Sequence, residues 1–427
     1  MTPRRRFLAG LGALALEAGG CRRRARPTEG GRPPGPIRLV FQHQPFLGDP
    51  APLRRLFSDF ERENEGIVVV PELLPSAPGA VHQYYLTALE GGSQDFDVFI
   101  IDVIWVAEFA RAGWIAELTD AFPPDLLRRD FLPGAANAVI VGDSTFAVPW
   151  YIDVGVFYRR RDRVPQAPRT YAEVVAHARE AAPRGSPMRG YLWQGLQSEA
   201  LVCNVYEAIW GHGGVTMLGG RILLDTPEAR AALEHLRALI TCGISPASVA
   251  SMAEEESRRV FQSGGAVFMR NWPYAWAEAE SPGSPVRGRV GLSALPTVDG
   301  AIGRGALGGF QIALNAHTPA WKVDAAHRFM AHLTSPEANL AIALAYGRNP
   351  PRAAVYRDPR LLAGAPAIAG LLPLVERAEP RPVTAYYPLI NGTLAAEFSA
   401  AITGVRTPAE ALRRAQAEVD HLMREDP

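Results

Sequence analysis

The sequence predicts an α/β protein that folds as two domains, and two observations lead to this prediction. Short β-branched runs alternate with segments of helical periodicity, and the order strand, helix, strand is that of parallel βαβ units. The chain of 427 residues also exceeds what one hydrophobic core usually organises. No internal repeat of fixed period is present in the sequence.

The first part of the chain carries two such units. Strands are expected at 37–41, 67–70 and 97–101, and helices at 52–64, 84–89 and 103–112, the last of which stops at Gly113. Asp102 stands between the carboxyl end of a strand and the first turn of the next helix. It is therefore either the N-cap of that helix or a ligand contact.

Segment 146–158 (FAVPWYIDVGVFY) has a different character, because a Pro-containing turn leads into a strand that Asp153 interrupts. A carboxylate inside an otherwise apolar strand is costly to bury without a partner. Asp153 is therefore expected either to face a cleft or to pair with Arg159 or Arg160. The sequence leaves both alternatives open.

Further elements follow in the remainder of the chain. Asn349 and the two prolines after it end the last helix of this series, and a Pro-rich stretch at 373–388 precedes the C-terminal helices. The expected helices lie at 171–181, 199–210, 227–241, 254–263, 321–333 and 336–346, and the expected strands at 265–269, 290–294 and 310–313.

Three aromatic rings stand close together at the end of one of these strands. In segment 266–276 (AVFMRNWPYAW), the strand runs into a turn that carries Trp272, Tyr274 and Trp276. Aromatic side chains usually belong to a hydrophobic core. At the carboxyl end of a strand, however, an indole can also form a flat floor for the apolar face of a ligand.

Charge and motifs exclude several classes of function. The chain has 44 basic and 44 acidic residues, which provides no general field for nucleic acid or an anionic membrane. The sequence lacks phosphate-binding loops, GxSxG, HExxH and EF-hand patterns, and its nine histidines are scattered. We therefore expect no cofactor, no metal and no catalytic triad. An acidic pair of the glycosidase type cannot be positioned from sequence.

The N-terminal residues are expected to be a targeting segment rather than part of the fold. Residues 1–21 combine an arginine-rich start, a short apolar run and small residues before Cys21, which is typical of an export signal with a lipoprotein acceptor cysteine. The RRRFL sequence leaves general and twin-arginine export as alternatives. Residues 22–36 are rich in Pro, Gly and Arg and are expected to be a flexible tether.

Only Cys203 and Cys242 follow this segment, without a CxxC motif or zinc-like spacing. We expect two buried free thiols. A disulfide is the alternative that export would permit.

From residue 37 onward, the chain resembles the extracellular solute-binding proteins of bacterial ABC sugar importers, in particular the maltose-binding-protein-like group and its trehalose/maltose-binding branch. Several stretches carry this resemblance in the right order: FERENEGIVV at 60–69, DFDVFIIDVIWVAEFARAGWIAEL at 95–118, AVPWYIDVGVFYRR at 147–160, QGLQSEALVCNVYEAIWGHGG at 194–214, EEESRRVFQSGGAVFMRNWPYAW at 254–276, LGGFQIAL at 307–314 and PRPVTAYYP at 380–388.

The resemblance implies a periplasmic-binding-protein fold with two discontinuous α/β lobes that close over one ligand. Lobe one would comprise 37–148 and 307–347, and lobe two 149–306 and 348–427. The hinge crossings would lie near Pro149, Gly305 and Asn349.

The resemblance also implies the ligand-binding residues. Carboxylates would accept hydrogen bonds from sugar hydroxyls, an arginine would donate to ring and hydroxyl oxygens, and aromatic faces would cover the apolar side of the sugar. The residues are Asp102, Tyr151, Asp153, Glu199, Trp272, the backbone of Gly309, Phe310 and Arg381.

Within this set, Trp272 is the expected sugar platform, whereas Tyr274 and Trp276 are assigned to lobe packing. Relatives of this branch commonly have Trp at the position of Phe310 and an aromatic residue at the position of Ser198. An altered subsite is therefore expected here.

The resemblance implies an exported, lipid-anchored and monomeric receptor that delivers a di- or oligosaccharide to a pair of ABC permeases. One alternative is a sensor that presents a sugar-dependent surface to a membrane receptor. Another is an exported glycosidase in which Asp102, Asp153 or Glu199 supply the acid and base. The binding roles above require no catalysis, and we expect no enzyme.

Overall fold

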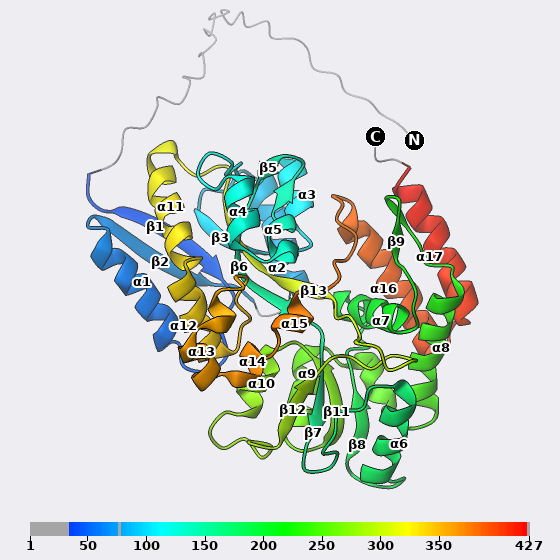
Figure 1. The fold of residues 1–427 in the computed structure, drawn as a ribbon. Helices are drawn as coiled ribbons and strands as arrows, with labels where there is room; N and C mark the ends of the chain where they lie inside the picture. Colours follow the sequence, from blue (N-terminus) through cyan, green and yellow to red (C-terminus); the bar gives the residue numbers. More distant parts are fainter. Residues whose placement is uncertain (1–33, 76–77, 425–427) are drawn as a thin grey trace, which may run out of the picture. The chain divides into compact units, whose positions relative to one another are not determined.

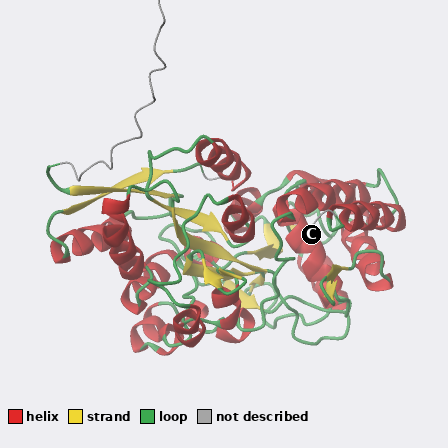
Figure 2. Cartoon of the chain, turned by 90° about the horizontal axis from the view of Figure 1, so that it is seen from above, coloured by secondary structure: helices red, strands yellow, loops and turns green. Residues whose placement is uncertain are grey.

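The computed structural model describes residues 34–75 and 78–424, and its elements belong to the unit Pro36–Pro427. Its strands form two main sheets, with helices on both sides of the strands (Figures 1 and 2). The predicted α/β class is therefore confirmed. The strands of the main sheets are β1 (Ile37–His43), β2 (Ile67–Leu73), β3 (Val98–Asp102), β6 (Val148–Val154), β7 (Val156–Arg160), β8 (Arg189–Leu192), β11 (Ala266–Asn271), β12 (Val290–Ser293) and β13 (Leu307–Leu314).

Helices connect and cover these strands. They are α1 (Ala51–Glu63), α2 (Pro78–Glu90), α3 (Val106–Ala112), α4 (Pro124–Asp130), α5 (Pro133–Asn137), α6 (Tyr171–Ala181), α7 (Glu199–Gly211), α8 (Pro227–Thr241), α9 (Glu254–Gln262), α10 (Tyr274–Ala279), α11 (Ala320–Leu333), α12 (Pro336–Tyr346), α13 (Pro359–Gly364), α14 (Pro366–Ala369), α15 (Leu372–Val375), α16 (Tyr387–Thr403) and α17 (Pro408–Leu422). Short 3-10 helices span Ala247–Ser251 and Val355–Arg357, and two small hairpins pair β4 (Ile140–Val141) with β5 (Ser144–Thr145) and β9 (Met217–Leu218) with β10 (Arg221–Ile222).

The first sheet has five strands in the order β2-β1-β3-β13-β6. Strand β1 pairs in parallel with β2 and with β3, as the strand, helix, strand order predicts. Strand β13 runs antiparallel to both β3 and β6. A segment from late in the chain therefore lies between two strands from its first half (Figure 1).

The core of this sheet follows from helical periodicity. Helix α1 buries Leu53, Leu56, Phe57 and Phe60, which recur at i, i+3, i+4 and i+7 and so lie on one face. The rings of Phe57 and Phe60 meet Phe329 of α11, with centroids 6.0 and 5.1 Å away. Helices α11 and α12 therefore share one core with the N-terminal elements (Figure 1).

The second sheet has four strands in the order β12-β7-β11-β8. Strand β11 lies antiparallel to β7 and parallel to β8, and β12 is antiparallel to β7. Helix α7 is buried on every side after its first residue, because it packs against both α8 and α16. Strand β11 in the interior of this sheet carries the aromatic turn at its carboxyl end.

The chain passes from the first sheet to the second at Gly155. A Cβ added to Gly155 would collide with the Glu207 carboxylate, and one added to Gly305 would collide with the Gly155 carbonyl oxygen. The Ile152 amide donates to the Asn349 carbonyl at 3.0 Å. Three segments that are far apart in the sequence therefore meet at this point.

Pro149, near which a hinge crossing is predicted, lies inside β6, before the sheet crossing at Gly155. Strand β6 stays in the first sheet as far as Val154. The division into lobes of 37–148 with 307–347 and 149–306 with 348–427 stays a prediction.

Three local predictions require correction. Asp102 is the last residue of β3 and is not the N-cap of α3, because Trp105 occupies that position. The Asp102 carboxylate instead accepts a hydrogen bond from the Ile104 amide at 3.2 Å. Strand β8 was not predicted, since its sequence RGYL contains no apolar alternation. Cys203 and Cys242 are both free, but Cys242 is exposed at the end of α8 rather than buried.

The predicted export segment 1–21, its Cys21 and most of the predicted tether lie outside the described residues. Among the helices of the described residues, none combines the length and apolarity that a membrane span requires.

A buried ion pair joins helix α7 to the second sheet. Arg270 on β11 donates to both carboxylate oxygens of Glu207, over 2.8 Å from Nε and 2.5 Å from Nη2. Glu207 Oε1 also accepts the amide of Ala306 at 3.0 Å, on the segment that leads back to the first sheet. Both side chains are almost fully buried, so each depends on the other for its charge.

We predict that Glu207→Ala lowers the free energy of unfolding by about 3–5 kcal/mol, because it leaves the Arg270 guanidinium buried without a counter-charge. Urea unfolding measures the change. The control is Glu337→Ala, which breaks an exposed bidentate pair with Arg360 and should lower the free energy of unfolding much less, because water screens exposed charges. Equal costs for the two variants would contradict the prediction.

Candidate functional site

The predicted site residues of the first sheet lie on three neighbouring strands. Phe310 on β13 is in register with Asp102 on β3 and with Tyr151 on β6. The Tyr151 and Phe310 rings lie 5.6 Å apart, inclined at 39°. The pairing of the strands therefore places a carboxylate and two aromatic rings side by side.

Gly309 allows β13 to lie close to β6, because it has no side chain. Its φ of 120° is a left-handed value that favours glycine, and an added Cβ would collide with the Tyr151 carbonyl oxygen. Its own carbonyl oxygen accepts the Val103 amide at 3.1 Å. The backbone of Gly309 therefore fixes the positions of both Tyr151 and the chain after Asp102.

Trp272 is held in place by contacts on several sides. Its Nε1 donates to Glu254 Oε1 at 3.3 Å, and the Arg270 guanidinium lies 4.1 Å from the ring centroid. A Cβ added to Gly308 would lie only 3.1 Å from the indole, so β13 passes close to its edge. The ring is half-buried, with a cation against one of its faces.

Arg381 joins two of the predicted carboxylates. Its Nε lies 2.8 Å from Glu199 Oε1, and its Nη2 lies 3.7 Å from Asp102 Oδ1. A hydrogen bond from Nη1 to the Leu307 carbonyl at 2.6 Å fixes the guanidinium. The hydroxyl of Tyr387 donates to both oxygens of Glu199, at 3.0 and 3.1 Å.

The carboxylates of this group retain their protons more readily than free ones. Burial raises the pKa of Glu199 to about 7, although Arg381 opposes the shift, and Asp102 adds to it. Burial likewise raises the pKa of Asp102, against the opposing effect of Arg381. The single arginine therefore compensates only part of the desolvation of two carboxylates.

Asp153 has a partner that the sequence did not indicate. Its Oδ2 lies 3.5 Å from Arg348 Nη1, whereas Arg160 pairs with Asp162 and Arg159 contacts the Pro165 carbonyl. The predicted pairing with Arg159 or Arg160 is wrong, because those arginines lie on β7 in the other sheet. Burial raises the pKa of Asp153 to about 6, with Arg348 opposing and Asp102 adding to the shift.

Within the part of the chain that the structure describes, Asp153 Oδ1 is buried without a hydrogen-bond partner. An unpaired buried carboxylate oxygen is costly in a folded protein. This oxygen therefore has unused capacity to accept a hydrogen bond.

Arg348 contacts the predicted site residues Tyr151 and Asp153, and the sequence reasoning did not include it. Its guanidinium lies over the rings of Tyr274, Tyr151 and Phe46, with 4.8, 4.9 and 5.4 Å to the centroids. The sequence contained one indication of this position, because Arg348 precedes Asn349, near which a hinge crossing is predicted. Tyr387 and Glu254 were also missed, although Tyr387 follows Arg381 in the same stretch.

Tyr274 and Trp276 were assigned to packing. Tyr274 contacts Arg348 and donates from its hydroxyl to Glu255 Oε1 at 2.8 Å, so it supports a charged group rather than only an apolar core. Trp276 is half-buried and packs against the hydrophobic core.

This arrangement favours binding of a neutral, hydroxyl-rich molecule. Several carboxylates provide hydrogen-bond acceptors, while the arginines are already engaged with them. The Cys203 thiol lies 3.6 Å from Glu199 Oε1, but burial raises its pKa, which leaves it unsuited to act as a nucleophile. No group of three potential ligand side chains among the described residues is placed to hold a metal ion.

Comparisons with known proteins identify relatives of this chain. The family model for bacterial extracellular solute-binding proteins matches residues 47–340. A probable ABC transporter-binding protein of Deinococcus radiodurans is 30% identical over 360 residues, which cover 81% of this chain and 84% of the relative.

Solved structures agree with this result. The maltose-bound MalE3 of T. maritima is 34% identical, with a TM-score of 0.84 over 90% of this chain and 100% of that one. The GacH receptor of Streptomyces glaucescens is 22% identical, with a TM-score of 0.81 over 91% of this chain and 99% of that one, which shows a shared fold. The predicted two-lobe α/β fold is confirmed by these matches.

We predict that the stability of the protein falls as pH rises from about 5 to 7, because of Glu199. Its pKa is raised from 4.5 to about 7 on folding, so in this window the folded chain holds more protons than the unfolded chain. The free energy of unfolding contributed by this group is then lost as pH increases, and the loss levels off above pH 7.

Glu199→Gln removes this titration and should reduce the slope in urea unfolding measured at pH 5, 6, 7 and 8, with the part due to Asp102 and Asp153 remaining. The exposed Glu418→Gln is the matched control and should keep the slope of the parent protein. An unchanged slope in the Glu199→Gln variant would overturn this assignment.

Proposed function

This chain belongs to the bacterial extracellular solute-binding proteins, and from this premise we propose that its solute is a di- or oligosaccharide of the trehalose or maltose type. Members of this family are exported, bind small molecules and work with the permeases of ABC transporters. They are binding proteins rather than enzymes. The proposal therefore concerns the ligand and the residues that contact it.

The position of Trp272 is the observation that carries the proposal. Arg270 lies over the indole and Glu254 accepts a hydrogen bond from its Nε1, so the ring is oriented before any ligand arrives. A preoriented indole next to carboxylates is suited to the two surfaces of a sugar, the apolar C–H face and the hydroxyl edge. Orientation in advance reduces the entropy that binding costs.

The proposed contacts divide by chemistry. Trp272, Tyr151 and Phe310 would cover apolar sugar faces, and Asp102, Asp153 and Glu199 would accept from hydroxyls. Arg381 would donate to sugar oxygens, and Gly309 would hold the backbone of this edge.

Asp153 Oδ1 supports this division, because it is buried without a partner among the described residues. A ligand hydroxyl would supply the missing hydrogen bond. We add Arg348, which lies over Tyr151 and pairs with Asp153, to the residues that shape the site.

Closure around the ligand is part of the proposal. Trp272 follows β11 of the second sheet, whereas Asp102, Tyr151 and Phe310 belong to the first. A ligand that contacts both groups would favour the closed arrangement through its differential contacts. The predicted lobe division describes the two parts that would move.

Membrane attachment and oligomeric state are also proposed. Residues 1–21 would direct export, Cys21 would carry a lipid, and the receptor would work as a monomer.

One relative bears on the ligand. MalE3 of T. maritima is 34% identical to this chain, and its structure was solved with maltose bound.

We predict that one of a panel of saccharides that includes maltose and trehalose raises the melting temperature and changes the tryptophan fluorescence. Binding to the folded state alone increases apparent stability. Trp272→Ala should weaken this binding by at least about 30-fold in calorimetry, which corresponds to the loss of a contact worth about 2 kcal/mol.

Trp321→Ala, on α11, is the control, because it also removes one tryptophan and lies outside the proposed site. It should leave affinity unchanged. A panel of di- and oligosaccharides that shifts neither melting nor fluorescence would refute the sugar proposal.

A further inference from the structure

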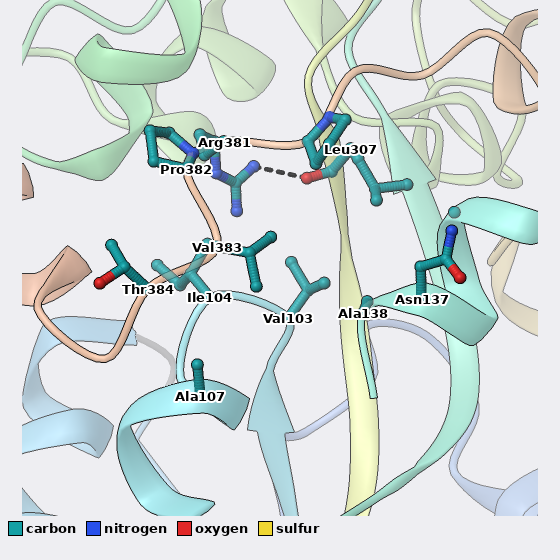
Figure 3. A pocket seen from close by; sticks show the side chains of 12 residues that line it. Val103, Ile104, Ala107, Asn137, Ala138, Leu307, Arg381, Pro382, Val383 and Thr384 are labelled. Carbon is teal, nitrogen blue, oxygen red and sulfur yellow. Dashed lines mark hydrogen bonds between the residues drawn. The ribbon is translucent and has the colours of Figure 1, made fainter. Parts of the chain in front are cut away.

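A cavity of about 170 Å³ lies beside Arg381, outside the group of aromatic rings. Its walls come from the chain after Asp102 and the start of α3, from the end of α5, from the first residue of β13, and from segment 380–384. In Figure 3, Val103, Ile104 and Val383 lie between the Arg381 side chain and Ala107. Apart from Arg381, none of the predicted ligand-binding residues lines this space.

The lining of the cavity is mainly aliphatic. Asn137, Thr384 and Arg381 are its polar members, and the others carry aliphatic side chains, proline rings or no side chain. The Arg381 guanidinium is already engaged with the Leu307 carbonyl and Glu199. A sugar ring in this space would leave several hydroxyls without partners, which is costly, whereas an apolar group would not.

The size of the cavity narrows the choice of occupant. An apolar cavity of about 150 Å³ in another protein is large enough to bind benzene. Ordinary packing defects in protein interiors rarely exceed one water molecule. A space of 170 Å³ therefore accommodates one aromatic ring or a short branched alkyl group.

The cavity adjoins the proposed sugar site, and Arg381 belongs to both. Val103 and Ile104 directly follow Asp102, and Arg381 both lines the cavity and contacts the Asp102 and Glu199 carboxylates. The space is not fully enclosed, and Val383 in its wall is exposed. A substituent on the sugar unit nearest to Asp102 would enter this space.

We propose that this cavity is a subsite for an apolar aglycone, so that the solute is a glycoside with an aryl or short branched alkyl group rather than a free sugar. The inference rests on the proposed saccharide-binding function. Burial of one phenyl ring in an apolar space should tighten binding about tenfold or more.

The test compares sugars with their phenyl glycosides by calorimetry on the folded protein. The probes are maltose, cellobiose and lactose, each beside its α- and β-phenyl glycoside. We expect the phenyl glycoside of a sugar that binds to have at least tenfold higher affinity than that sugar.

Variants identify where the phenyl group lies. Ala107→Phe fills the cavity. It should abolish the gain in affinity that the phenyl group provides, while the affinity for the free sugar stays unchanged. Val383→Asp places a charge in the wall at an exposed position and should reduce the gain even if Ala107→Phe fails to fold. Ala112→Phe, on the exposed end of the same helix, is the matched control and should retain the full gain.

The outcomes separate the two proposals. If a sugar binds and its phenyl glycosides bind no more tightly, or if both cavity variants keep the gain, the aglycone subsite is refuted and the sugar receptor stands. If none of the three sugars and none of their phenyl glycosides binds, the aglycone subsite is refuted, and if the wider saccharide panel is also negative, both proposals fail.

Discussion

The buried pair of Arg270 and Glu207 is the interaction on which the rest of the site depends. It joins β11 to α7, and Gln194 adds a further contact to the Arg270 guanidinium at 3.3 Å. The other face of the arginine supports the indole of Trp272, while Glu207 accepts the Ala306 amide at the sheet crossing. One charge pair therefore contacts both the Trp272 ring and the segment that leads back to the first sheet. Such a pair is costly to form, and it is more costly to break once it is buried.

A second constraint is the shortage of cations around the carboxylates. Asp102 and Glu199 share Arg381, and Asp153 is paired with Arg348. Because both arginines are already committed, an anionic ligand would add charge to an acceptor-rich region without gaining a free counter-charge. Hydroxyl groups, in contrast, donate to carboxylates without bringing charge of their own. The balance of charges therefore supports the proposal of a neutral ligand.

Much of the fold could be predicted from the sequence, because its elements are set by local patterns. Helix α1 places Leu53, Leu56, Phe57 and Phe60 at helical spacing, and β1, β2 and β3 are short β-branched runs with helices between them. Strand β8 was missed because four residues carry too little pattern. The pairing of Asp153 with Arg348 was missed because the two lie 195 residues apart and meet only after the sheets assemble. Residue chemistry alone also left Trp272 open between core and platform, since that choice depends on Arg270, Glu254 and Gly308, which only the folded chain brings to the ring.

The position of Cys203 makes the protein its own reporter of site opening. Its sulfur is fully buried against Glu199 and Arg381, whereas Cys242 is exposed at the end of α8. A thiol reagent added to the folded receptor therefore reacts at once with Cys242 and reaches Cys203 only when the groups around it separate. The rate at which Cys203 is modified therefore reports how readily these groups separate. Local opening of the ligand-free receptor around Cys203 can thus be followed without engineering a probe into the protein.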